Sequence, residues 1–294
     1  MDYTENQKNE IRDALSRYVR RYPSQKKAAA SLRGVSEATL SVILAGKYEN
    51  ISSDMWSRLR SQVCSSMDGY TLAETSARAA LCGYLKKMQD DSSVMWITGP
   101  AGVGKSTTAR EYAENGFNVF LLLCTQDMSR PDFMKELAAC IGIDNAGMSI
   151  RDTFQAVINH LITLDRPLII FDEADKLKDN VLLYFITIYN ELEDRCGIVF
   201  LSTDAIKRRF DTGIAYNKIG FNELFSRIAR RFVPLRPATR QEVEEICRCN
   251  GIEDKNAVRS VVAEAAEALN DLRRVKRCIS KQKEIEAYKK QKND

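Results

Sequence analysis

The stretch GPAGVGKST at residues 99–107 constrains this chain more than any other segment. It fits the pattern GxxxxGK[ST], follows the apolar run VMWITG (94–99) and precedes a helical segment, which is the context of a phosphate-binding loop. Glycines let such a loop wrap, so that backbone N–H groups and a helix N-terminus face phosphate oxygens. A glycine-rich strand-to-helix turn without a ligand is the alternative.

The residue types in this loop predict ATP and Mg²⁺ as cofactors. Lys105 is expected to reach the β- and γ-phosphates, and the Ser106 hydroxyl to ligate Mg²⁺. The expected nucleotide contacts are Gly99, Gly102, Val103, Gly104, Lys105, Ser106 and Thr107.

Acidic residues end a second apolar run, PLIIFDEAD at 167–175. Asp172 fits the acid that holds Mg²⁺, and Glu173 is placed to orient the attacking water. A third run, GIVFLST at 197–203, ends in hydroxyls. Thr203, with Ser202 next, is the candidate for holding that water; a strand that simply ends at Ser-Thr-Asp is an equal alternative.

Five short apolar runs alternate with amphipathic stretches, which predicts an α/β fold with a parallel sheet buried on both faces. These runs are 94–99, 117–124, 167–172, 197–203 and 231–236. After Pro237 the pattern is helical to the end, as in a helical lid. The expected domains are a helical module at 1–65, an α/β nucleotide-binding domain at 66–238, and a lid with a basic tail at 239–294.

The N-terminal module has a helix-turn-helix rhythm within residues 24–50. A helix over KKAAASL meets a turn at Arg33-Gly34, and Ser36 is expected to cap the next helix. That helix would lie in a major groove if the module binds DNA. It carries few long basic side chains, so strong base readout is not expected, and a protein-contact module is the alternative.

Three arginines, Arg227, Arg230 and Arg231, precede the fifth predicted strand. An arginine supplied by a neighbouring subunit stabilises the charge that develops on a transferred phosphoryl group. Arg227 is the favoured candidate for this role, which would make the protein an oligomer. A solvated basic helix face is the alternative.

The order GPAGVGKST, LIIFDEAD, GIVFLST, LFSRIARR and NDLRRV resembles AAA+ ATPases, and within them the phage Mu B family of transposition helper ATPases. The resemblance covers essentially the whole chain and implies an AAA+ fold. It makes Arg273, with Arg274 behind it, the lid arginine that contacts the γ-phosphate. It also implies ATP-dependent filaments on double-stranded DNA that deliver target DNA to a transposase and stimulate it.

Two other functions stay open: a replication-initiator or helicase-loader ATPase acting on a protein partner, and a DNA-binding regulator for which ATP is an assembly cue. DNA contact from residues 144–160 is in doubt, because this segment offers only Arg151 and His160. Other candidates are Lys176, Lys178 and the KRR at 207–209.

Charge and cysteine usage indicate which kind of partner and which cellular compartment to expect. The net charge is +4 and both ends of the chain are basic, which suits a polyanionic partner. The eight cysteines are scattered through core-like segments, so reduced thiols and a cytoplasmic location are expected. No apolar run reaches the roughly 18 residues that span a bilayer, so no membrane partner is expected.

Overall fold

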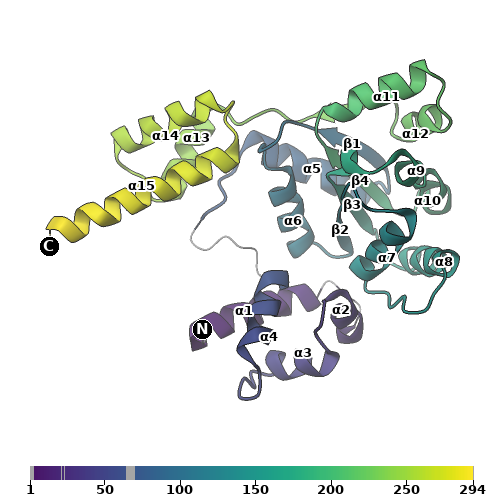
Figure 1. Cartoon of the computed structure of the whole chain (residues 1–294), viewed down its shortest axis with the longest axis horizontal. Helices are drawn as coiled ribbons and strands as arrows, with labels where there is room; N and C mark the ends of the chain where they lie inside the picture. Colours follow the sequence, from purple (N-terminus) through teal and green to yellow (C-terminus); the bar gives the residue numbers. More distant parts are fainter. Residues whose placement is uncertain (1–2, 21, 23, 64–69, 294) are drawn as a thin grey trace.

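The computed structural model describes residues 3–20, 22, 24–63 and 70–293 (Figure 1). The expected boundary between residues 65 and 66 lies outside the described residues, as do residues 66–69 of the expected connector. Within the described chain, no helix combines the length and the apolar character that a bilayer crossing requires.

A five-stranded sheet with the order β2-β3-β4-β1-β5 forms the centre of the molecule, and every pairing is parallel. The strands are β1 (Val94–Thr98), β2 (Val119–Leu123), β3 (Leu168–Asp172), β4 (Gly197–Ser202) and β5 (Phe232–Pro234). All five predicted strands are therefore confirmed, and so is the α/β fold class. The carboxyl ends of β1, β3 and β4, the three central strands, meet at one edge of the sheet, where the nucleotide motifs begin.

Side chains of the central strands alternate between two cores, as a sheet buried on both faces requires. Ile169 and Phe171 of β3 face one core, while Leu168 and Ile170 face the other. Helices α5 (Ser76–Asp90) and α6 (Lys105–Asn115) cover the second core. The first core lies under α7 (Arg130–Ile141), α8 (Ile150–Leu161), η1 (Ala174–Lys176), α9 (Asp179–Leu182), α10 (Phe185–Leu192), α11 (Ala205–Ala215) and α12 (Phe221–Arg227).

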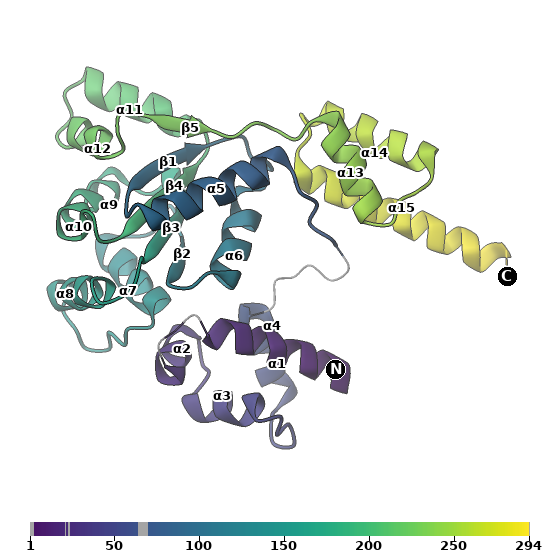
Figure 2. The same cartoon turned by 180° about the vertical axis from the view of Figure 1, so that it is seen from behind.

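Three helices with a core of their own follow the sheet: α13 (Arg240–Cys249), α14 (Lys255–Glu267) and α15 (Leu272–Asn293). Both views show them apart from the sheet, in yellow and yellow-green (Figures 1 and 2). The segment before α5 joins this core through Ala73. The Asn250 side chain accepts a hydrogen bond from the Thr71 N–H and donates one to its carbonyl, both at 2.9 Å.

The N-terminal helices also pack around their own core: α1 (Glu5–Val19), α2 (Gln25–Ser31), α3 (Glu37–Leu44) and α4 (Ser53–Val63). The Ser36 hydroxyl accepts from the Thr39 N–H and caps α3, as predicted. Gly34 takes a φ of +68° at the predicted turn. The module contacts the sheet domain at α7, where the Tyr22 hydroxyl donates to the Cys140 carbonyl at 3.1 Å.

Candidate functional site

A cavity of about 300 Å³ opens where the phosphate-binding loop meets β3, β4 and the start of α15. Gly102 and Gly104 take φ values of +75° and +100°, which only glycine adopts without strain. Gly104 directly precedes α6, so the N-terminus of this helix faces the cavity. The predicted loop residues that line the cavity are Gly102, Val103, Gly104, Lys105, Ser106 and Thr107. Gly99 instead lies against Leu235 and Val103.

Lys105 spans the loop from inside the cavity. Its Nζ donates to the carbonyls of Gly99 at 2.6 Å and Pro100 at 3.0 Å. Burial lowers the pKa of Lys105, and the positive charge of Arg273 adds to this, while Asp172, Asp175 and Asp204 act in the opposite direction. Phosphate oxygens in the cavity would strengthen the charged form, because an opposite charge nearby favours an ammonium.

Asp172 ends β3 and is 4% exposed. Burial raises the pKa of its carboxyl group, and a hydrogen bond from the Ser106 side chain lowers it in part. The Ser106 hydroxyl and the Asp172 carboxylate, the two predicted Mg²⁺ ligands, therefore lie within reach of one cation. Among the described residues no three His, Cys, Asp or Glu side chains form a metal cluster. This donor set fits Mg²⁺, which binds proteins through one or two carboxylates and takes its other ligands from water and phosphate.

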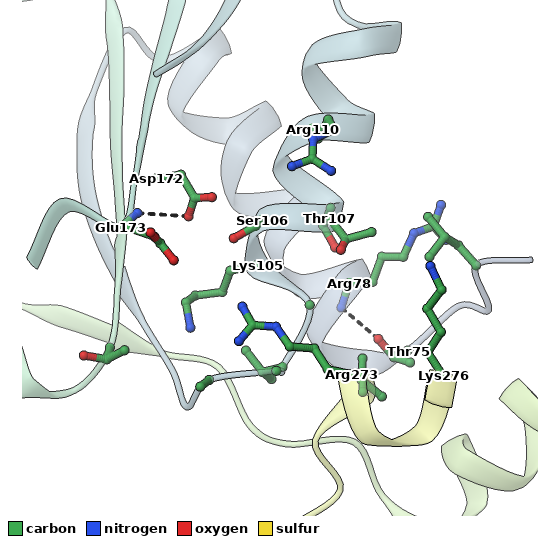
Figure 3. Close-up of a pocket in the computed structure, with 18 of the residues that line it drawn as sticks. Thr75, Arg78, Lys105, Ser106, Thr107, Arg110, Asp172, Glu173, Arg273 and Lys276 are labelled. Atoms are coloured by element: carbon green, nitrogen blue, oxygen red, sulfur yellow. Dashed lines mark hydrogen bonds between the residues drawn. The ribbon is translucent and has the colours of Figure 1, made fainter. Parts of the chain in front are cut away.

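Glu173 follows with a φ of +57°, and its N–H donates to the Asp172 Oδ1 at 3.0 Å (Figure 3). This left-handed backbone turns the Glu173 side chain toward the cavity, which it lines. The carboxylate forms an ion pair with Lys176. Two predicted acids thus meet Lys105 at one edge of the sheet, although the Lys176 contact was not predicted.

Thr203 lines the cavity from the end of β4, and its hydroxyl donates to the Asp175 carboxylate. The neighbouring Ser202 hydroxyl is engaged elsewhere: it accepts from the Trp96 Nε1 at 2.8 Å and donates to the Thr203 carbonyl at 3.0 Å. The Ser202 hydroxyl already both accepts and donates within the protein, whereas the Thr203 hydroxyl only donates and keeps both lone pairs for a ligand. Asp175 was missed as a site residue, although it stands in the same DEAD stretch as Asp172.

The start of α15 closes the cavity against the phosphate-binding loop. The Leu272 N–H donates to the Gly102 carbonyl at 2.9 Å. Arg273 then projects into the cavity near Lys105 (Figure 3), whereas Arg274 bonds to the Glu264 Oε2 at 3.0 Å. The geometry therefore favours Arg273 over Arg274 as the lid arginine.

The other end of the cavity is lined by residues that sequence patterns did not single out. Tyr70, Leu72 and Ala73 come from the segment before α5, and Ile246 and Leu272 from the lid. The Lys276 ammonium lies 5.3 Å from the centre of the Tyr70 ring, and burial raises the pKa of Tyr70 to about 12. Apolar walls of this kind suit a nucleobase. Apart from Leu272, which stands in NDLRRV, no short motif marks them, because they come from two segments more than 170 positions apart.

Arg227 is not among the described residues that line the cavity. Its Nη2 donates to the Asn190 Oδ1 at 2.8 Å and the Glu223 Oε1 at 2.9 Å, and its guanidinium lies 5.0 Å from the centre of the Tyr189 ring. Its side chain is 24% exposed. A role at a neighbouring subunit's nucleotide stays a prediction, and it would require Arg227 to exchange these contacts.

The candidate DNA contacts differ in their surroundings. Lys176 pairs with Glu173, and Lys207 pairs with Asp204 at 2.6 Å. Arg209 is 24% exposed and bonds to Asp179. The remaining candidates, Arg151, Lys178 and Arg208, are exposed, while His160 is half-buried.

His160 lies against the N-terminal module rather than facing a ligand. Its Nδ1 is 3.2 Å from the Lys27 Nζ on α2. Burial, and secondarily the Lys27 charge, lower the pKa of His160. His160 on α8 thus takes part in the contact between α8 and α2 of the N-terminal module.

Comparison with known proteins agrees with the geometry. Residues 88–210 match a family model described as an AAA domain. The Mu-like prophage FluMu DNA transposition protein B of Haemophilus influenzae is 24% identical over 248 residues, covering 82% of this chain and 85% of that protein. The ATP-dependent target DNA activator B of Escherichia phage Mu is 25% identical over 230 residues, covering 76% of this chain and 72% of that protein. The solved structure of Cdc6p from Pyrobaculum aerophilum is 15% identical at a TM-score of 0.46, covering 62% of this chain and 51% of that one. Residues 88–210 are thus similar to an AAA domain, and the chain resembles the Mu transposition B proteins, as its motifs predicted.

Proposed function

We propose that this protein is a Mg²⁺-dependent ATPase that assembles on double-stranded DNA, delivers it as a target to a transposase and stimulates that transposase. One observation carries the ATPase part: Lys105, Glu173 and Thr203 line one cavity together with Arg273 of the lid. These side chains come from four separate elements, and each has a role in phosphoryl transfer.

The residues divide the reaction between them. Lys105 and Arg273 place positive charge where the transferred phosphoryl group develops negative charge. Glu173 accepts a proton of the attacking water, and Thr203 fixes the direction of that water. Ser106 and Asp172 would hold Mg²⁺, which when bound would supply charge neutralisation on the phosphates. Arg227 of a neighbouring subunit would add a further positive charge at the γ-phosphate.

The DNA and transposase part rests on the two relatives, whose names describe a DNA transposition protein and an ATP-dependent target DNA activator. A net charge of +4 favours contact with a polyanion. Lys178 and Arg208 are exposed cations outside the cavity. They suit contact with DNA phosphates, which carries little sequence information.

ATP hydrolysis measured with and without double-stranded DNA tests the proposal, with Lys105→Ala as the matched control. Hydrolysis that DNA stimulates and that Lys105→Ala abolishes is the expected result. Lys178→Gln should weaken DNA binding and reduce its salt dependence by about one released counterion. Equal hydrolysis with and without DNA would contradict the DNA-dependent part.

Electron microscopy of the protein with DNA and ATP, ADP or no nucleotide tests the assembly. Helical filaments that require both ATP and DNA are expected. Small closed rings, or assembly indifferent to DNA, would instead support an ATPase that loads or remodels a protein partner.

A further inference from the structure

Asp175 is the nearest polar partner of the hydroxyl that faces the nucleotide cavity. Its Oδ2 accepts a hydrogen bond from the Thr203 hydroxyl and another, at 3.2 Å, from the Thr203 N–H. Asp175 itself lines the cavity. Neither the family comparisons nor the two phosphate-site motifs assign this carboxylate a role.

The turn that carries Asp175 is fixed independently of its side chain. Ala174 and Leu177, on either side, are 0% and 3% exposed. Arg209 of α11 donates to the Asp175 carbonyl at 3.2 Å and to the Asp179 Oδ1 at 2.8 Å. The turn should therefore keep its place when the Asp175 carboxylate is removed.

Ser202 and Trp96 hold the backbone of Thr203 without the help of Asp175. Ser202 donates to the Thr203 carbonyl, and the buried Trp96 donates to Ser202. Rotation about the Thr203 side chain is thus the main freedom left, and Asp175 determines where its hydroxyl hydrogen points.

The single hydrogen of the Thr203 hydroxyl limits which hydrogen bonds this side chain can form with a ligand. A hydroxyl has one hydrogen to donate and two lone pairs to accept with, and an ionised carboxylate only accepts. With its hydrogen committed to Asp175, Thr203 presents lone pairs to the cavity. It therefore accepts a hydrogen bond from water and does not donate one to a phosphate oxygen.

We propose that Asp175 is a positioning residue for ATP hydrolysis: it holds the Thr203 hydroxyl as an acceptor that orients the attacking water. Glu173 is an acceptor as well, so a water between the two side chains directs one hydrogen to each. One of the two lone pairs of this water can then face the phosphorus. This proposal rests on the proposed ATPase function.

A double-mutant cycle measures the coupling, using Asp175→Ala, Thr203→Ala and the double variant, with kcat and KM for ATP determined on the full chain with DNA. Asp175→Ala should lower kcat about tenfold, equivalent to about 1.4 kcal/mol, with little change in KM. In the Thr203→Ala variant, adding Asp175→Ala should lower kcat no further. Additive losses, or an unchanged kcat in Asp175→Ala, overturn the proposal.

Asp175→Asn is the conservative variant. Its amide oxygen still accepts from both Thr203 groups, so kcat should recover most of the loss even though the charge is gone. A kcat as low as that of Asp175→Ala overturns the proposal, and this variant decides the question should Asp175→Ala fail to fold. Absence of hydrolysis by the wild type overturns the proposed function and this proposal with it, whereas active wild type with additive losses overturns this proposal alone.

Discussion

Replacing Gly102 with alanine is the sharpest test of how the lid meets the phosphate-binding loop. A Cβ at Gly102 would lie 1.9 Å from the Asp271 Oδ1 and 2.1 Å from its Cγ, far inside van der Waals contact. The Asp271 carboxylate cannot turn away freely, because its Oδ1 accepts from the Arg273 N–H at 2.7 Å. The added methyl group must therefore displace the start of α15.

The substitution lowers folding stability in two ways and ATP-binding free energy in a third. A φ of +75° costs a non-glycine residue roughly 1–2 kcal/mol. Displacing α15 also loses the hydrogen bond from Leu272 to the Gly102 carbonyl, worth about 1 kcal/mol. Arg273 moves with the helix, and losing its charge-assisted bond to a phosphate costs about 1.5–3 kcal/mol of binding energy. ATP affinity should then fall by at least about tenfold.

Gly147→Ala is the matched control. Gly147 has the same φ of +75°, but no atom lies within 4 Å of the position its Cβ would take. Chemical denaturation should show the backbone cost in both variants, while equilibrium titration with ATP should show weakened binding in Gly102→Ala alone. Adding Asp271→Ala to Gly102→Ala removes the clashing atoms and should recover part of the affinity. Equal ATP affinity in the two glycine variants, or no recovery in the double variant, would refute the steric argument.

Four further predictions follow from the site and the module contact. Lys105→Ala should abolish ATP binding in an equilibrium titration; retained affinity would remove the phosphate-loop assignment. Glu173→Gln should bind ATP, stop turnover and prolong assemblies seen by microscopy, and unchanged turnover would exclude Glu173 as the water-orienting acid. Arg227→Ala should keep ATP binding but lower hydrolysis by up to about 10³-fold, and mixing it with Lys105→Ala should restore some activity if the arginine acts on a neighbour; no rescue would point to a role within its own subunit. Because the folded-state pKa of His160 lies below its usual 6.5, the unfolded chain takes up the proton first, so stability should fall as the pH drops below 6.5. Denaturation at pH 7.5 and 5.5 checks this, and His160→Gln should reduce the pH dependence.

Much of the fold could be predicted because the sequence patterns that mark its strands lie within short segments. Runs such as PLIIFD are apolar throughout, since both faces of a central strand are buried, and glycines and acids mark where each strand ends. The same locality explains why Lys105 and Asp172 line one cavity, since the loop and the acid each directly follow a strand of one parallel sheet. The carboxyl ends of such strands meet at one edge whatever lies between them in the sequence.

Most of the residues that were missed, and the contacts of Arg227, depend on packing between segments far apart in the sequence. Tyr70 meets Lys276 only because the segment before α5 packs into the lid core. Arg227 stands in an arginine-rich stretch, but its sequence neighbours do not reveal its contacts with Tyr189 and Asn190 on α10. Periodicity reports which face of a helix is buried, not which helix covers it.

The contact between the phosphate-binding loop and the start of α15 connects nucleotide binding with the position of the lid. The Gly102 carbonyl accepts from Leu272, and the absent Cβ of Gly102 makes room for Asp271, so the loop that holds phosphate also holds the lid. Arg273 directly follows Leu272 and enters the cavity beside this contact. A phosphate bound between Lys105 and Arg273 would then join the loop and the lid through opposite charges. ATP binding should therefore stabilise the lid against the sheet domain, and ADP, which lacks the γ-phosphate, should do so less. Since α15 carries the basic C-terminal segment, this difference would give the nucleotide state an effect on where that segment lies.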